Sequence, residues 1–511
     1  MSVVLLLAAI GVMVWYYAVH LKSGHQGITI QKEPVFQAPT PSMIATKKYF
    51  LIVALLLLLQ VVFGVITAHY TVEGNAFFGI RTGEILPYSV SRTWHVQLAL
   101  FWIATALLGT GLYLAPMISG YEPPYQRWGV NFLWVCLVII VLGSMTGEWF
   151  GIQQFLSLKM NFWFGHQGYQ YVDLGRFWQS FLMVGLCVWL ILMVRAMMPA
   201  LRNKTQNRSL LFLFCIAVFT ITAFYGAGFM WGEHTNLAIV EYWRWWVVHL
   251  WVEGIFEIFT TTAVAFLFVN LGLLDRHKAT KTVLLATSIY AFGGIIGLFH
   301  HLYFTATPQT VIILGGIFSA LEVVPLTLMG FEAYHNYEIS KSSPWVAIYK
   351  WPIYFFIAVS FWNLVGAGLF GFLINMPSAL YHVQGLNTTP LHAHAALYGV
   401  YGNLSIGLLL FCMNSFINKK NIIRDEKLVS WVFWLLNVGI ASMCFFSLLP
   451  VGLYQAWTSI THDMWYARSE HFTSQPIVHM FIWMRAFGDT LFGLGSLGLV
   501  VLVIKKMIYR R

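Results

Sequence analysis

Apolar runs about as long as a membrane is thick recur along nearly the whole chain. A bilayer core of roughly 30 Å needs about 20 apolar residues in helical form. Strands of a membrane barrel would instead show alternating segments about ten residues long, and that pattern is absent. The sequence therefore predicts an all-α integral membrane protein with about 13 transmembrane helices. The thirteen runs lie near residues 2–20, 48–68, 92–118, 129–150, 177–200, 209–230, 242–274, 280–304, 309–336, 348–374, 390–418, 428–455 and 477–507.

The basic residues indicate how these helices cross the membrane, because short cytoplasmic loops collect Lys and Arg. If the N-terminus lies outside, 22 of the 29 basic residues fall on the cytoplasmic side and seven on the outer side. The net charge of +10 then reflects topology and contact with anionic membrane lipid, and it is no evidence for nucleic acid. We expect the C-terminus in the cytoplasm.

The first run is expected to be a retained helix rather than a cleaved signal peptide. No basic residue precedes its apolar stretch, and Lys22 follows it. Three prolines mark residues 33–46 as a cytoplasmic linker. We therefore divide the chain into residues 1–46, a helix with its linker, and residues 47–511, a membrane domain of twelve helices.

Ionisable side chains within the apolar runs are the functional candidates, because the bilayer excludes such groups unless they have a role. On the predicted topology, six histidines lie toward the outer ends of their helices, so they can meet in one layer. These are His95, His249, His300, His301, His392 and His394.

The spacing of these histidines adds detail. His392 and His394 would point about 200° apart on a regular helix, so one helix can serve two cofactors. His249, Glu253 and Glu257 repeat every four residues and would line one helix face. A six-coordinate haem needs two histidines, a reactive haem needs one, and a neighbouring metal wants three nitrogens, which accounts for all six. The chain contains no C-x-x-C-H motif for a covalently attached haem.

Four motifs together resemble the catalytic subunit of bacterial nitric oxide reductases, within the haem-copper oxidase superfamily. They are HLWVEG, the FHH pair, SALEVVP and PLHAHAALYG, and the resemblance spans roughly residues 45–505. It implies a location in the bacterial cytoplasmic membrane. It also implies that His95 and His394 are the axial ligands of a low-spin haem b, with His392 the proximal ligand of a high-spin haem b3. His249, His300 and His301 would hold a non-haem iron, with Glu253 as an oxygen ligand.

Glu253 separates two reactions of the superfamily. Respiratory oxidases typically carry a crosslinked tyrosine four residues after the first metal histidine, where this chain has Glu253. A carboxylate is a harder ligand than imidazole and shifts the preference from copper toward iron. The resemblance implies that two nitric oxide molecules couple to nitrous oxide and water with two electrons and two protons. Glu257 and Glu322 are candidates for proton delivery or for tuning the iron.

Within the family, AHYTVEG and WMRAFGDTLFG resemble the quinol-dependent type. By that resemblance His69, Glu73 and Asp489 would contact the quinol head group. Members of this type usually begin with another helix and a hydrophilic domain, and this sequence starts at what looks like their second helix. We favour a separate small subunit carrying a transmembrane helix and that hydrophilic domain. A calcium site or a haem-propionate salt bridge at Asp173 or Arg176 is a further suggestion of the resemblance.

Three other functions remain open. A dioxygen-reducing quinol oxidase would need the crosslinkable tyrosine and polar proton channels. A nitric oxide dismutase would share the scaffold but is expected to alter metal and quinol residues that are intact here. A haem-binding membrane sensor or transporter would explain a pair of axial histidines but not HLWVEG beside a double-histidine helix.

Overall fold

The computed structural model describes residues 38–77, 79–167, 174–202, 208–340 and 346–509, with a few isolated residues before position 20. Over these residues the secondary structure is helical, apart from two isolated bridges, Phe77 to Ile80 and His166 to Leu174. The first apolar run, near residues 2–20, lies almost wholly outside the described residues. Its predicted helix therefore stays a prediction.

Twelve membrane spans account for the predicted bundle. Within the described residues, eleven helices are long and apolar enough to cross a membrane, and a bent pair makes the twelfth. Each span covers one of the predicted runs from 48–68 onward, so the all-α membrane class is confirmed. The spans are Pro41–Glu73, Tyr88–Ser119, Gln126–Ile152, Arg176–Arg202, Arg208–Phe229, Leu237–Asn270, the pair Arg276–Ala291 and Gly293–Thr305, Gln309–Phe331, Val346–Asn375, Thr388–Asn414, Glu426–Thr461 and Pro476–Ile508.

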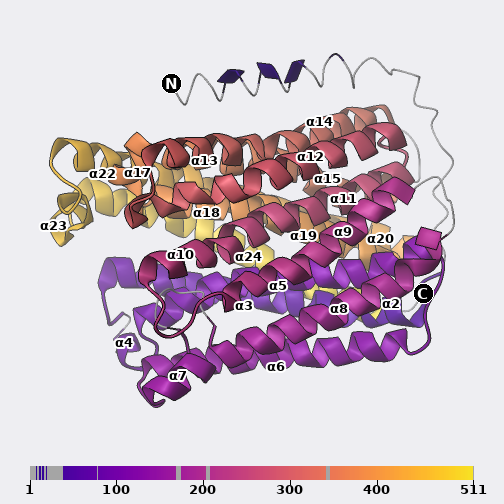
Figure 1. Ribbon diagram of the computed structural model, residues 1–511, viewed down its shortest axis with the longest axis horizontal. Coiled ribbons are helices and arrows are strands. Elements are labelled where there is room, and N and C mark those ends of the chain that lie inside the picture. Colours follow the sequence, from indigo (N-terminus) through magenta and orange to yellow (C-terminus); the bar gives the residue numbers. More distant parts are fainter. Residues whose placement is uncertain are drawn as a thin grey trace.

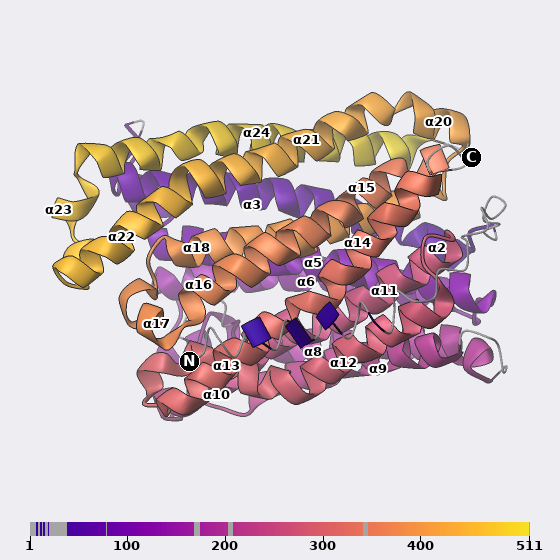
Figure 2. The same cartoon turned by 90° about the horizontal axis from the view of Figure 1, so that it is seen from above.

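The spans run side by side along the long axis of the molecule (Figures 1 and 2). In order, their elements are α2 (Pro41–Ala45), α3 (Lys47–Glu73), α5 (Tyr88–Ser119), α6 (Gln126–Ile152), α8 (Arg176–Arg202), α9 (Arg208–Tyr225), η1 (Gly226–Phe229), α10 (Leu237–Trp245), η2 (Trp246–Ile255), α11 (Phe256–Asn270), α12 (Arg276–Gly297), η3 (Leu298–Thr305), α13 (Gln309–Leu321), α14 (Val323–Ser340), α15 (Val346–Trp362), η4 (Asn363–Phe370), α16 (Gly371–Asn375), α18 (Thr388–Ala393), η5 (His394–Gly402), α19 (Asn403–Asn414), α21 (Glu426–Met443), η6 (Cys444–Leu448), α22 (Leu449–Thr461) and α24 (Pro476–Ile508).

Short helices close the two ends of the bundle. At one end lie α4 (Thr82–Ile85), α7 (Leu158–Phe164), α17 (Pro377–Val383), η7 (Tyr466–Arg468) and α23 (Glu470–Thr473). At the other end α2 and α20 (Lys419–Arg424) lie near the C-terminus (Figures 1 and 2). The end with α20 corresponds to the predicted cytoplasmic side, and the end with α17 and α23 to the predicted outer side.

Three spans form the interior of the bundle. In their most apolar stretches, 83% of Tyr88–Ser119, 94% of Leu237–Asn270 and 89% of Thr388–Asn414 is buried, against 28% of Pro41–Glu73. Lipid does not reach these three helices, so any polar group on them must be satisfied by protein or by a bound cofactor. They carry four of the six candidate histidines.

Several spans depart from regular α-helix. η2, η4, η5 and η6 are π-helical, and η3 is a 3-10 segment after a 46° bend. The bend falls at the Gly293–Gly294 pair, and paired glycines are a common cause of such kinks. π-helical turns inside longer helices are frequent at functional sites, because they offset side chains from regular spacing.

Candidate metal centre

Three imidazoles converge from two spans. His249 lies in η2, and His300 and His301 lie in η3. Their ring centres are 5.0 Å apart for His249 and His300, 4.9 Å for His249 and His301, and 4.0 Å for His300 and His301. One ring nitrogen from each residue lies within 4.8 Å of the other two. Metal–nitrogen bonds of about 2 Å make this spacing suitable for one ion held by three nitrogens.

The His301 ring is fixed from outside the triad. It stacks on Trp245, with ring centres 3.7 Å apart and planes 4° from parallel. The Trp245 indole donates a hydrogen bond to Glu241 (3.2 Å), and the Arg244 guanidinium lies 5.0 Å over its ring. Partners of this kind orient metal-binding side chains before the metal arrives.

The space next to the triad is kept open by a glycine. A Cβ on Gly297 would lie 3.4 Å from Nε2 of His249 and 3.5 Å from Oε1 of Glu322. Gly297 therefore leaves an imidazole and a carboxylate facing a common gap. The side chain of Glu253, the predicted oxygen ligand, lies outside the described part of the chain.

A second pair of histidines faces across the bundle interior. His95 in α5 and His394 in η5 have ring centres 5.8 Å apart and planes 30° from parallel. One iron bound between two imidazoles at about 2 Å from each nitrogen would separate the ring centres by about 6 Å. The observed spacing therefore fits an ion held from both sides.

All three predicted haem histidines have the same ring nitrogen occupied. Nδ1 of His95 bonds to the carbonyl of Gln60 (2.9 Å), that of His392 to Gly366 (2.9 Å), and that of His394 to Pro390 (2.7 Å). Since a carbonyl only accepts, Nδ1 carries the hydrogen and Nε2 keeps its lone pair. This tautomer presents Nε2 for metal binding.

Glycines make room for two of these rings. A Cβ on Gly64 of α3 would lie 2.7 Å from Cε1 of His95, and a Cβ on Gly371 of α16 would lie 2.9 Å from Cε1 of His392. Both distances are shorter than carbon atoms tolerate. The ring positions, the tautomers and the glycine cradles together fit histidine-ligated haem.

A small cavity lies between His392 and one member of the triad. His392 and His300 both line it, together with Glu257 and Glu322. His394 belongs to the pair with His95, so the two neighbouring histidines serve opposite sides of their helix, as the spacing predicts. Tyr401, Asn363, Asn375 and Ser319 add further polar groups to the lining.

The regular-helix argument for His249, Glu253 and Glu257 needs a correction. η2 is π-helical from Trp246 to Ile255 and becomes α-helical at Phe256, so the three positions do not follow one helical period. The carboxyl group of Glu257 nevertheless lines the cavity with His300. Glu257 and Glu322 are both buried, as predicted for groups that handle protons.

Two of the three predicted quinol residues meet near the outer end of α3. His69 Nδ1 is hydrogen-bonded to Glu73, and the His69 ring stacks on Phe77 at 5.0 Å. Trp483 of α24 lies 6.4 Å from the same ring. Asp489 bonds instead to Arg485, one turn away on α24 (2.8 Å).

Arg176 is buried, and its guanidinium group donates hydrogen bonds to backbone carbonyls. It donates to the carbonyls of Gly228 (2.8 Å) and Trp231, and its guanidinium also lies over the Trp231 ring. These contacts tie α8 to the segment after α9. Asp173, the other half of the calcium suggestion, lies outside the described residues.

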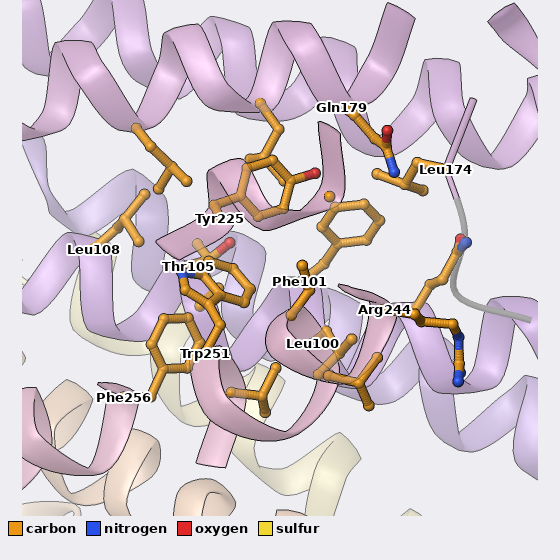
Figure 3. A pocket seen from close by; sticks show the side chains of 18 of the residues that line it. Leu100, Phe101, Thr105, Leu108, Leu174, Gln179, Tyr225, Arg244, Trp251 and Phe256 are labelled. Carbon is orange, nitrogen blue, oxygen red and sulfur yellow. The ribbon is translucent and has the colours of Figure 1, made fainter. Parts of the chain in front are cut away.

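A larger cavity borders the same central span. It lies between α5, α6, α8, α9 and the α10–η2–α11 span, and its walls are mainly apolar. Figure 3 shows Gln179 and Arg244 toward one end and Leu108, Trp251 and Phe256 toward the other. Gln97 also lines it and donates through Nε2 to Glu148, a fully buried carboxylate of α6.

Sequence reasoning missed several of these residues. Glu148 is an ionisable group within an apolar run, so the signal that found the histidines applied to it as well. Arg485 offered the same signal. Tyr290, which donates a hydrogen bond to the backbone carbonyl of Glu322 (3.2 Å), carried no such signal because tyrosine is common in membrane helices.

Comparison with known proteins places these residues in a known scaffold. The family model described as "Cytochrome C and Quinol oxidase polypeptide I" matches residues 44–491. A chain in a cryo-EM structure of a heme-copper terminal oxidase dimer superimposes with a TM-score of 0.60 at 12% identity. That superposition covers 92% of this chain and 85% of the other chain, and at such low identity it shows the fold alone.

Two curated relatives are similar in sequence. A nitric oxide reductase subunit from Stutzerimonas stutzeri is 25% identical over 460 residues, covering 89% of this chain and 93% of the relative. The "Cytochrome c oxidase subunit 1 homolog, bacteroid" of Bradyrhizobium diazoefficiens is 25% identical over 266 residues, covering 50% of this chain and 45% of the relative.

Proposed function

This chain belongs to the cytochrome c and quinol oxidase polypeptide I family, and from that premise we propose that it reduces nitric oxide to nitrous oxide with electrons from quinol. The observation that carries the proposal is the triad of His249, His300 and His301, with a glutamate at position 253 of the span that carries His249. The similarity to the nitric oxide reductase subunit of Stutzerimonas stutzeri over most of both chains supports it.

The proposal assigns each candidate histidine a cofactor. His95 and His394 would hold a low-spin haem b, and His392 a high-spin haem b3. His249, His300 and His301, with Glu253, would hold a non-haem iron. When bound, these groups supply electron transfer and metal coordination of nitric oxide. A carboxylate added to three imidazoles favours iron over copper.

The protein's own residues handle protons and exclude water. Coupling two nitric oxide molecules to nitrous oxide and water consumes two electrons and two protons. Glu257 and Glu322 line the cavity next to His300 and His392, so their carboxyl oxygens can hold protons where they are needed. Both side chains are buried, which keeps bulk water away from the reacting molecules.

The electron-input part of the proposal rests on the outer end of α3. His69 and Glu73 form a hydrogen-bonded pair whose side chains are 18% and 30% exposed, and Phe77 and Trp483 flank the His69 ring. An aromatic-walled imidazole–carboxylate pair can accept the two protons that a quinol gives up on oxidation. Asp489 lies on α24, the helix that also carries Trp483.

The proposal also covers membrane placement and a partner. We place the N-terminus outside and the C-terminus, with α20, in the cytoplasm of a bacterial inner membrane. We also propose a separate small subunit with one transmembrane helix and a hydrophilic domain. Reporter fusions at both termini test the first point. Co-purification of a second protein with a tagged form of this chain tests the proposed subunit. Full turnover by this chain alone would contradict the need for that subunit.

Turnover of the purified protein with a reduced quinol analogue tests the function. We expect one nitrous oxide for every two nitric oxide molecules consumed, with two haems b and one non-haem iron bound. His69→Ala should abolish turnover with quinol and retain it with an artificial electron donor. The rival reaction is dioxygen reduction, which the bacteroid relative's name suggests for that protein. Dioxygen consumption without nitric oxide consumption would overturn the proposal, and release of dinitrogen and oxygen would replace it with dismutation.

A further inference from the structure

One amide side chain joins two π-helical segments of the bundle interior. Asn437 of α21 accepts a hydrogen bond from the indole of Trp362 (3.1 Å) and donates one to the side chain of Asn403 (3.0 Å). Trp362 is the residue directly before η4, and Asn403 is the residue directly after η5. Asn437 also donates to the carbonyl of Phe433, one turn earlier on α21 (3.0 Å). A single side chain of a neighbouring helix thus meets the boundary of each segment.

This chain of hydrogen bonds has one possible direction. It begins at the indole N–H of Trp362, which can only donate, and it ends at the carbonyl of Gly399, which accepts from Nδ2 of Asn403 (2.9 Å). Each of the two amides between these ends must therefore present its oxygen toward the indole and its nitrogen toward the carbonyl. Trp362 is 2% exposed and Asn403 is fully buried. Loss of Asn437 would leave buried polar groups unsatisfied on both sides, which costs more than a hydrogen bond contributes.

The two segments also pack closely against each other. A Cβ on Gly399 of η5 would lie 2.6 Å from Cγ of Trp362, and a Cβ on Gly366 of η4 would lie 2.5 Å from the backbone oxygen of Ala395 in η5. π-helix is rare and occurs mostly as single turns within α-helices, so neighbouring contacts must hold η4 and η5 in this form. The close packing and the hydrogen bonds of Asn437 together fix the position of η4 along η5.

That position matters for His392. This histidine lies in α18, which continues directly into η5, and its Nδ1 donates to the Gly366 carbonyl of η4 (2.9 Å). Because the hydrogen bond crosses from one span to the other, a shift of η4 along η5 would lengthen it. His394 differs, since its Nδ1 donates to Pro390 of its own span (2.7 Å). A shift between the two segments would therefore disturb the contact of His392 and spare that of His394.

We propose that Asn437 is a positioning residue that holds η4 in register with η5, and so keeps the Gly366 carbonyl on Nδ1 of His392. This inference rests on the proposed function for the haem that His392 would hold. With this hydrogen bond in place, the imidazole is a stronger electron donor to an iron bound at Nε2. Asn437 acts on the histidine through the two backbone segments.

Hydrogen exchange of the main-chain amides tests the register. Asn437→Leu keeps a similar volume and removes all three hydrogen bonds of the side chain. Exchange within residues 363–370 and 394–402 should become about 10-fold faster, as expected when a segment loses a net hydrogen bond. Gln126→Leu is the matched control, because Gln126 is 1% exposed and links α6 to the Leu192 carbonyl of α8 (2.9 Å). The control should leave exchange in the two segments unchanged.

The iron–histidine stretching band of the ferrous high-spin haem, measured by resonance Raman scattering, gives a second readout. Asn437→Leu should move this band to lower wavenumber, because a weaker hydrogen bond at Nδ1 makes His392 a weaker donor. The electron paramagnetic resonance spectrum of the low-spin haem should stay unchanged, whereas a merely structural role would disturb both haems.

A second variant cuts the chain at one end only. Trp362→Phe keeps a packed aromatic ring and removes the indole N–H, so it should move the iron–histidine band in the same direction. The double variant with Asn437→Leu should shift the band no further than Asn437→Leu alone, because both changes break the same link.

Unchanged exchange in both segments of Asn437→Leu would overturn the inference, and so would an iron–histidine band that stays in place. Equal disturbance of the two haems would also overturn it. If Asn437→Leu does not accumulate, Trp362→Phe decides the same measurements, because it removes only one hydrogen bond. If the wild-type protein binds no haem or reduces no nitric oxide, the proposed function fails, while the exchange rates still decide whether Asn437 holds the two segments in register.

Discussion

Two cavities border the span Leu237–Asn270, and their linings differ in kind. The smaller cavity takes Glu257 from this span and adds His300, His392 and Glu322 from others. The larger takes Val247, Val248, Trp251, Val252 and Phe256 from the same span. One helix therefore separates a polar chamber from an apolar one. Apart from Arg244 at one end, the residues that this span gives to the larger cavity are apolar, whereas the one it gives to the smaller cavity is an acid.

The hydrogen bonds of the two cavities make the same distinction. In the smaller cavity, Nδ2 of Asn363 donates to the Val323 carbonyl (2.7 Å) and to Thr327 (3.1 Å). In the larger cavity, Oγ1 of Thr105 and Oε1 of Gln179 are buried and make no hydrogen bond within the described residues. Asn363 is thus held in place by protein contacts, although its Oδ1 also has no partner among the described residues, whereas the Thr105 hydroxyl group makes no hydrogen bond there.

The largest effect is expected from removing a donor of the triad. His301→Ala should release the non-haem metal and lower nitric oxide turnover by more than about 100-fold, since even partners outside the ligand set are worth 10- to 100-fold. Iron content and turnover measure it. His382→Ala is the control, because His382 bonds to Ser459 at the bundle end. If the His301→Ala variant retains its iron, His301 is not a ligand of the metal.

A smaller effect is expected at the glycine beneath His392. Gly371→Ala places a Cβ 2.9 Å from Cε1 of that ring, so the imidazole must shift. Haem affinity should fall by about 10- to 100-fold, the range for disturbing the orientation of a ligand. The haem-to-protein ratio after dilution measures it. Gly232→Ala, where an added Cβ meets nothing within 4 Å, should retain full haem. Equal haem content in both variants would contradict the view that Gly371 makes room for the His392 ring.

The smallest effects test the polarity contrast itself, and they should have opposite signs. Thr105→Val removes an unpaired hydroxyl group from the apolar cavity and should raise the free energy of unfolding by about 1 kcal/mol. Asn363→Leu removes two hydrogen bonds from the polar cavity and should lower it by about 1–3 kcal/mol. Unfolding of the detergent-solubilised protein measures both. Two changes of the same sign would mean that the cavities do not differ as described.

The membrane spans could be predicted from sequence because bilayer thickness fixes the length of an apolar run. The twelve runs from 48–68 onward each became a span. The 46° bend at Gly293 and the π-helical turns did not follow from those runs. Such turns depend on how neighbouring helices pack, and the spacing of residues in the sequence does not record it.

The histidines of the site were predictable because a membrane excludes ionisable groups. The structure brings His249, His300 and His301 together and pairs His95 with His394. The roles of these residues as ligands stay predictions. Tyr290 could not be found in this way, because its hydrogen bond to the Glu322 carbonyl depends on how α12 packs against α13. Asp489 turned out to pair with Arg485, which its sequence motif did not indicate.

The carbonyl partners of His95, His392 and His394 have an evolutionary consequence. A hydrogen bond at Nδ1 makes an imidazole a stronger electron donor and so lowers the reduction potential of an iron bound at Nε2. Each acceptor here is a main-chain oxygen, on Gln60, Gly366 or Pro390. No point mutation can delete a main-chain oxygen. The contribution of these hydrogen bonds to the reduction potential of a bound iron would therefore be buffered against sequence drift, and it would change only when a helix shifts its register.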